Sequence, residues 1–236
     1  MKRLLNPIIL KWKEPGGYRE ILVMAVPLII STGSWSIQSF IDRMFLSWYS
    51  TDAIAAAMPA GILNFTFMSF FIGAAGYVTT FIAQYNGAGQ PEKIGPSLWQ
   101  GIYLSAAGGL LLLALVPAAP LIFRLAGHEK EIQRLEIIYF TILCYGAFPA
   151  IAASSLSGFH SGLGTTMPIM WINLAATSFN VIFDYLLIFG HGGFPEMGIK
   201  GAAIATAFSG VVSVSLYSAI IFTKRNNRKY STVSGF

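Results

Sequence analysis

The chain has 236 residues, of which 55% are hydrophobic and only 11% are charged, whereas a soluble domain carries about 25% charged residues. This composition excludes an ordinary soluble enzyme and favours a membrane protein. The net charge of +5 does not indicate nucleic-acid binding, because the basic residues gather at the ends of apolar segments rather than along one polar face.

The apolar segments predict an all-α transmembrane protein with six spans. Residues 1–18 hold only a short apolar patch between lysines, without a cleavage site, so we expect a cytoplasmic or interfacial segment rather than a signal peptide. Six longer segments each approach the roughly 20 residues that a span needs, and they do not alternate as barrel strands do. The expected helices are 19–48, 53–84, 96–124, 132–157, 165–190 and 199–223, followed by a basic cytoplasmic tail or linker at 224–236.

The distribution of lysine and arginine predicts the orientation. With the N-terminus in the cytoplasm, ten of these residues fall inside and five outside, as the positive-inside rule prefers. We therefore expect a multi-pass protein of the inner (cytoplasmic) membrane with both ends of this chain in the cytoplasm.

Prolines within the spans predict kinks, with Pro27 and Pro149 the best candidates. A proline in a membrane helix frees one backbone carbonyl and permits bending. Pro27 either serves as a hinge or only shapes the bundle.

Two acidic residues, Asp42 and Asp184, lie inside the predicted spans, whereas the other eight, Glu136 among them, fall in loops or near helix ends. A carboxylate at the bilayer centre costs about 2.5–3.5 kcal/mol, so such residues are functional candidates. Both lie roughly 9 Å below the outer helix ends, at about 1.5 Å per residue. Tyr139 and Thr206 fall at the same depth on two other helices, which predicts one polar layer.

A polar stripe runs along the fifth predicted helix. Asn173, Thr177, Asn180 and Asp184 are spaced so that they share one face, and Gln38 lies one turn before Asp42 on the first helix. The two stripes indicate a water-filled cleft, although asparagine and threonine also join membrane helices by hydrogen bonds. Arg43 directly follows Asp42, so this pair has a second interpretation as a mark of the membrane interface.

The remaining polar residues show no enzyme chemistry. His128, His160 and His191 lie in loops or at helix ends without metal-ligand spacing, which favours solvated side chains. No zinc, kinase or nucleophile-elbow motif is present. We therefore expect neither an enzyme nor a bound cofactor.

The sequence resembles the N-terminal half of the multidrug and toxic compound extrusion (MATE) transporters of the MOP superfamily, especially the archaeal and DinF-like branches. The resemblance rests on Ser36 to Ala57, Thr79 to Lys93, Leu156 to Gly190 and Met197 to Thr206. Its most specific parts are NVIFDYLLIFG, which begins at Asn180, and GAAIAT, which ends at Thr206.

The resemblance implies one six-helix lobe of a twelve-helix antiporter that exchanges H⁺ or Na⁺ for amphipathic, often cationic, compounds. It implies proton or cation binding at Asp42, Asp184, Asn180, Tyr139 and Thr206, with Na⁺ possible at Asp42, Asn180 and Asp184. Gln38, Asn173 and Thr177 would line the substrate cavity, and Pro27 would be the hinge. The expected partners are organic substrates, the coupling ion, the lipid bilayer, and a missing C-terminal lobe or second copy.

Two alternatives remain at this stage. A lipid-linked oligosaccharide flippase has similar helix architecture but should present basic residues to pyrophosphate, whereas the candidates here are acidic or amide side chains. In a non-transporting assembly subunit, the polar layer would serve only to hold the helices together.

Overall fold

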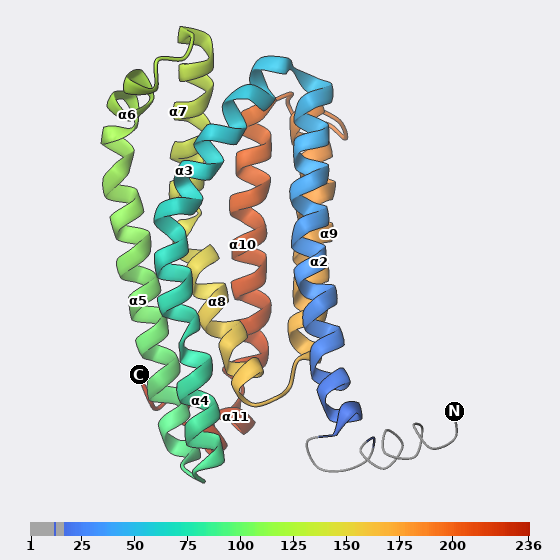
Figure 1. Cartoon of the computed structure of the whole chain (residues 1–236), viewed down its shortest axis with the longest axis vertical. Helices are drawn as coiled ribbons and strands as arrows, with labels where there is room; N and C mark the ends of the chain where they lie inside the picture. Colours follow the sequence, from blue (N-terminus) through green and yellow to red (C-terminus); the bar gives the residue numbers. More distant parts are fainter. Residues whose placement is uncertain (1–11, 13–16) are drawn as a thin grey trace, which may run out of the picture.

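The computed structural model describes Trp12 and residues 17–236. Within this part the chain forms α-helices and short 3-10 turns and contains no strand (Figure 1), which confirms the all-α prediction. The predicted N-terminal segment lies almost entirely outside the described residues.

The described helices make six lengthwise passes through the bundle (Figure 1). In chain order the helices are α2 (Tyr18–Tyr49), α3 (Thr51–Gly76), α4 (Val78–Gly87), α5 (Ile94–Leu115), α6 (Ala119–Ala126), α7 (Lys130–Tyr145), α8 (Ala147–Gly162), α9 (Met167–Phe189), α10 (Ile199–Ile221) and α11 (Lys224–Tyr230). The pairs α3–α4, α5–α6 and α7–α8 each make one pass. Five passes are long and apolar enough to cross a membrane as they stand, and α7 with α8 supplies a sixth.

The fourth pass is bent close to Pro149, where the sequence predicts a kink, and it extends beyond its predicted bounds. Residues 132–157 were expected to form one helix, but α7 and α8 meet at Gly146 with a bend of 44°. Pro149 has no N–H for the carbonyl of Tyr145, so the helical hydrogen bonds are interrupted there. Gly146 also lies against α10, where an added Cβ would come within 2.6 Å of the Ala207 Cβ. Two causes therefore act at the bend, namely the missing N–H of Pro149 and the close contact of Gly146 with α10.

Pro27 lies buried inside α2 and frees the carbonyl of Val23 from its helical hydrogen bond. The Thr166 hydroxyl, from the N-cap residue of α9, donates to this carbonyl at 3.5 Å. A buried carbonyl without a donor would be costly in an apolar surrounding. Thr166 therefore supplies from a neighbouring helix what the proline removes.

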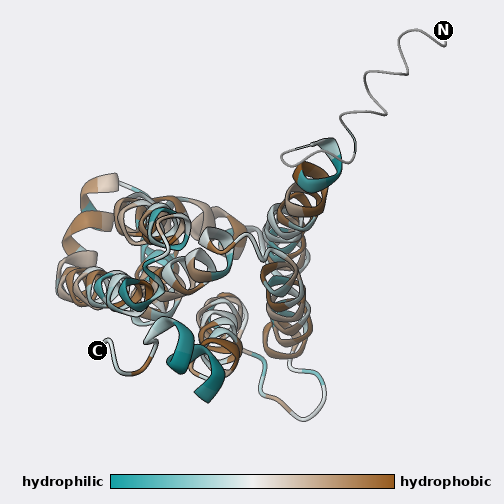
Figure 2. Cartoon of the chain, turned by 90° about the horizontal axis from the view of Figure 1, so that it is seen from below, coloured by the Kyte–Doolittle hydropathy of each residue, from teal (hydrophilic) through white to brown (hydrophobic). Residues whose placement is uncertain are grey.

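The two ends of the bundle differ in charge. We call the end with residues 49–51, 127–129 and 190–198 the upper end, and the end with residues 87–93, 163–166 and 222–236 the lower end (Figure 1). The basic helix α11 lies at the lower end and is hydrophilic, whereas apolar segments cover much of the bundle's outside (Figure 2). The following tail is anchored there, because the Trp99 indole N–H donates to the Thr232 carbonyl at 2.9 Å.

The helices pack in a fixed set of neighbours. α2 packs against α9, and α9 packs against α10; on the other side α3 packs against α7, and α5 against α8. Small residues permit these contacts, as is usual between membrane helices. At Gly109, for example, an added Cβ would lie 2.7 Å from the Phe148 Cβ, and at Gly201 it would lie 2.7 Å from the Leu187 carbonyl.

Replacing Thr166 by valine tests the contact with the Val23 carbonyl. We expect the Thr166→Val variant to lose about 1 kcal/mol of unfolding free energy, measured by denaturant titration of the purified chain in micelles. The matched background is Pro27→Ala, in which the new N–H serves the Val23 carbonyl. There the Thr166→Val change should cost much less, and an equal cost in both backgrounds would show that the hydroxyl does not compensate for the proline.

Candidate cation and substrate site

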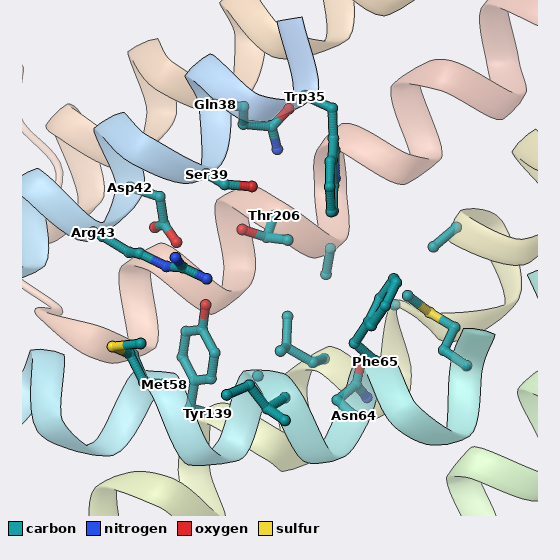
Figure 3. A pocket seen from close by; sticks show the side chains of 18 residues that line it. Trp35, Gln38, Ser39, Asp42, Arg43, Met58, Asn64, Phe65, Tyr139 and Thr206 are labelled. Carbon is teal, nitrogen blue, oxygen red and sulfur yellow. The ribbon is translucent and has the colours of Figure 1, made fainter. Parts of the chain in front are cut away.

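A cavity of about 310 Å³ opens into the upper half of the bundle (Figure 3), within the size range of small-molecule sites. Helix α2 supplies one wall, because its residues at intervals of three and four share a face. This wall consists of Trp35, Gln38, Ser39, Asp42 and Arg43.

The opposite walls come from α3, α7 and α10. Thr206 lines the cavity from α10, and the Tyr139 hydroxyl on α7 points toward Asp42 and Arg43 (Figure 3). Helix α3 adds Met58, Phe65 and Met68, which are large and polarizable apolar side chains. The cavity thus joins a polar end to an apolar body, as an amphipathic ligand requires.

Asp184 lies behind the cavity wall rather than on it. Its side chain is fully buried in α9, and its charge is close enough to interact with that of Asp42. In the orientation of the Asn180 amide that satisfies both of its ends, the nitrogen donates to Asp184 Oδ2 at 3.1 Å and the oxygen accepts from the Thr206 backbone N–H at 3.3 Å. Asn180 therefore links the acid on α9 to α10.

Each of the two carboxylates has one oxygen that forms no hydrogen bond in the described part of the chain. Among the described residues, Asp42 Oδ1 and Asp184 Oδ1 are buried and have no hydrogen-bond partner. A buried ionised carboxylate without a partner is costly, so each oxygen is a natural position for a proton or a hard cation. The described residues contain no cluster of three histidine, cysteine or acidic side chains, so any bound cation would also need amide or hydroxyl ligands.

The structure divides the sequence-predicted residues into two groups. Gln38, Asp42, Tyr139 and Thr206 line the cavity, with Asn180 and Asp184 directly behind. Asn173 and Thr177, which were predicted to line the substrate cavity, are not among the residues that line this one.

Asn173 and Thr177 instead join helices to one another. The Asn173 amide donates to the Ser31 hydroxyl on α2 and accepts from the Tyr217 hydroxyl on α10 at 3.4 Å. The Thr177 hydroxyl donates to Gln38 Oε1 at 3.2 Å. In this part of the expected cleft, side chains of α2 and α9 therefore bond directly to one another. The alternative of interhelical hydrogen bonds describes these two residues.

Arg43 was not predicted as a cavity residue, and the pair of Asp42 and Arg43 had a second interpretation as a mark of the membrane interface. Adjacent residues do point about 100° apart, and Arg43 makes no ion pair within the described part of the chain. Its long side chain nevertheless curls into the same cavity (Figure 3). The signal was present in the spacing of Trp35, Ser39 and Arg43, which follow one another every four residues.

Glu136 and His128 also differ from their predictions. Glu136 was expected near a solvated helix end and His128 in a solvated loop, but the Glu136 side chain is fully buried and its Oε1 lies 2.7 Å from His128 Nδ1. Helix α7 begins earlier than predicted, at Lys130. Gly127, with a φ of +75°, turns the preceding loop back over the carboxylate. The pair closes the upper end between α6 and α7.

Comparisons with known proteins agree with this fold. The MatE family profile matches residues 27–186. A protein from Synechocystis named probable multidrug resistance protein NorM is 35% identical over 194 residues, which are 80% of this chain and 41% of that protein. A protein of the same name from Shewanella oneidensis is 28% identical over 218 residues, or 92% of this chain and 47% of the relative.

Solved structures show the same helix arrangement. A MATE crystal structure in the straight conformation has a TM-score of 0.82 at 23% identity and covers 92% of this chain and 48% of its own. A MOP superfamily transporter from Pyrococcus furiosus has a TM-score of 0.79 at 24% identity, covering 89% of this chain and 46% of its own.

The fold and these matches define a multi-pass membrane protein of the transporter class, and not an enzyme. Because the family profile covers well over half of the chain, the chain belongs to the MatE family. It spans less than half the length of the curated relatives named above.

The buried pair of Glu136 and His128 yields a stability prediction. His128→Ala leaves the Glu136 carboxylate buried without its partner, so we expect a loss of about 2 kcal/mol in unfolding free energy. Adding Glu136→Gln to this variant should restore much of the loss. The exposed pair of Arg134 and Glu131, 3.5 Å apart, provides the control, because Arg134→Ala should change little. Equal effects of the two alanine variants would refute a structural role for the buried pair.

Proposed function

We propose that this chain forms one lobe of a cation-coupled exporter of amphipathic compounds. The observation that carries the proposal is the presence of two carboxylates, Asp42 and Asp184, each with a buried and unpartnered oxygen, at the polar end of a largely apolar cavity. The names of the multidrug resistance relatives support the same activity. The substrates would be small organic molecules, often cationic.

The coupling ion would act by neutralising charge. With Asp42 and Asp184 both ionised, their mutual repulsion and burial are offset best by a bound cationic substrate or metal ion. A proton would neutralise the same negative charge, and so would a Na⁺ ion held by Asp42, Asn180 and Asp184. The carboxylates would then no longer require a bound cationic substrate, which favours its release. Tyr139 and Thr206 complete the polar layer as hydroxyl partners. No bound cofactor enters this scheme.

Alternating access would use a bend of α2 at Pro27. This proline lies on the helix that carries five of the cavity residues, and proline is a common cause of helix kinks. Crystal structures of a related MATE protein bear the names straight and bent conformation. A change between a straight and a bent α2 in this chain would move the α2 wall of the cavity relative to Asp184.

The transport pathway would need a second lobe, either a C-terminal lobe or a second copy of this chain. Large apolar side chains at the cavity, including Trp35, Ile62 and Phe65, remain well exposed on this lobe alone. Positive charges gather at the lower end, where Lys93 and the four cations of α11 lie. This favours an inner-membrane protein with the lower end in the cytoplasm.

The alternatives have less support. A flippase for lipid-linked oligosaccharides should line its cavity with several cations, whereas this cavity contains two opposite charges. A purely structural subunit does not explain why two carboxylates with unpartnered oxygens gather beside one cavity inside the membrane spans.

Replacing Asp184 by asparagine tests the proposal. In cells without exporters of their own, we expect the transporter assembled from this lobe and its second lobe to expel a cationic dye, driven by H⁺ or Na⁺. The Asp184→Asn variant should lower efflux to the level of cells lacking the transporter, because its neutral side chain can no longer exchange one cation for another. Asp52→Asn, at an exposed position in the first turn of α3, is the matched control. Wild-type efflux by Asp184→Asn would refute the proposal.

A further inference from the structure

The cavity holds a cation that the proposed export of cationic compounds does not use. Arg43 lines the cavity next to Asp42, and its guanidinium extends between Asp42 and the Tyr139 hydroxyl (Figure 3). Within the described residues Arg43 forms no ion pair. A plain cation site would gain nothing from a fixed positive charge beside its carboxylate, because the charge repels the ligand.

An arginine inside a membrane span is costly, with a maximum of about 2.5–3.5 kcal/mol at the bilayer centre, and Arg43 lies on the cavity wall six residues before the end of α2. The charge of Asp42 acts on Arg43, but the two side chains form no ion pair in the described part of the chain. One Asp42 oxygen lacks a partner, and Asp184 lies buried behind the wall. The guanidinium therefore faces the cavity, where its N–H groups can donate hydrogen bonds to a ligand. Its planar fork fits a carboxylate through two parallel hydrogen bonds.

The charges on this wall cancel, which limits the ligand's own charge. Asp42 and Arg43 together present one negative and one positive group within a single turn of α2. A doubly charged phosphate would meet Arg43 but be repelled by Asp42. A ligand that carries one ammonium and one carboxylate satisfies both residues. The apolar wall of Trp35, Phe65 and Met68 would hold an aromatic body between them.

We propose that Arg43 is a specificity-determining residue that accepts a carboxylate, so that the cavity prefers amphipathic zwitterions to simple organic cations. The ligand's ammonium group lies at Asp42 and its carboxylate at Arg43. This inference rests on the proposed export function and adds the chemical class of its substrate.

The test uses two forms of one xanthene dye, a zwitterion with a free carboxylate and its methyl ester, which is a simple cation. Binding to the purified transporter, assembled from this lobe and its second lobe in lipid nanodiscs, is followed by fluorescence anisotropy. The wild-type transporter should bind the zwitterion more tightly than the ester. Arg43→Gln should weaken zwitterion binding by about tenfold, the scale of one lost charge-assisted interaction, and leave ester binding unchanged or tighter.

Two further variants make the result specific. Arg43→Lys keeps the charge but loses the fork, so it should retain part of the preference for the zwitterion. Arg124→Gln removes an exposed cation of α6 outside the cavity and should leave both affinities unchanged. It also measures the general effect of lost surface charge.

The outcomes separate this inference from the proposed function. Ester binding that is intact in the wild-type transporter, with no preference for the zwitterion or no selective effect of Arg43→Gln, would overturn the role of Arg43 alone. If neither dye binds the wild-type transporter, the substrate cavity itself is refuted, and the role of Arg43 falls with it. Selective loss of the zwitterion in Arg43→Gln, with Arg124→Gln unchanged, supports the inference.

Discussion

A membrane interior offers no water, so every buried polar group must find its partner within the protein or exchange it with a ligand. This constraint determines how α2, α9 and α10 are placed. The polar stripe of α9 would be costly in lipid, but Asn173 bonds to both flanking helices, and Thr177 bonds to Gln38. Even the carbonyl freed by Pro27 receives a donor from Thr166. The three helices are therefore held in register by satisfied polar groups.

Four buried side-chain atoms of the described residues lack a hydrogen-bond partner, namely Asp42 Oδ1, Asp184 Oδ1, Glu136 Oε2 and His160 Nε2, and the two aspartate oxygens lie at the cavity or directly behind its wall. Along the lower part of the contact between α2 and α9 the side chains bond to one another, whereas one oxygen of Asp42 and one of Asp184 lack partners farther up. Gln38 belongs to both regions, since it lines the cavity and also accepts from Thr177. A change at the cavity could thus reach the interhelical bonds through one side chain.

The sequence predicts the spans well because hydropathy depends on each residue alone. Counting residues from the helix ends also places Asp42, Tyr139, Asp184 and Thr206 in one layer, since depth follows from a constant rise per residue. What the pattern does not give is which members of a polar face meet the cavity. Asn173 and Thr177 share the face of Asn180 and Asp184, but they lie closer to the lower end of α9 and bond to neighbouring helices.

Side-chain length and loop geometry account for the other differences. Arg43 reaches the cavity although its Cβ is turned from that of Asp42, because a long flexible stem can curl around the helix. Glu136 is buried because Gly127 folds a loop over it and brings His128 within 2.7 Å. Neither result follows from local patterns, since each depends on where a distant segment lies in three dimensions.

The proposed hinge and the cavity are well separated along α2, and this separation gives the hinge its effect. Asp42 lies fifteen positions after Pro27, or roughly 22 Å along the helix at about 1.5 Å per residue. A bend of about 10° at the proline would then move Asp42 by roughly 4 Å over that length. Hydrogen bonds weaken within a few tenths of an ångström, so even this small bend would separate the α2 wall from Asp184 and Asn180. Thr166 lies at the pivot, on α9, where the displacement is small. A bend could therefore reorganise the cavity while the contact that compensates for the proline stays in place.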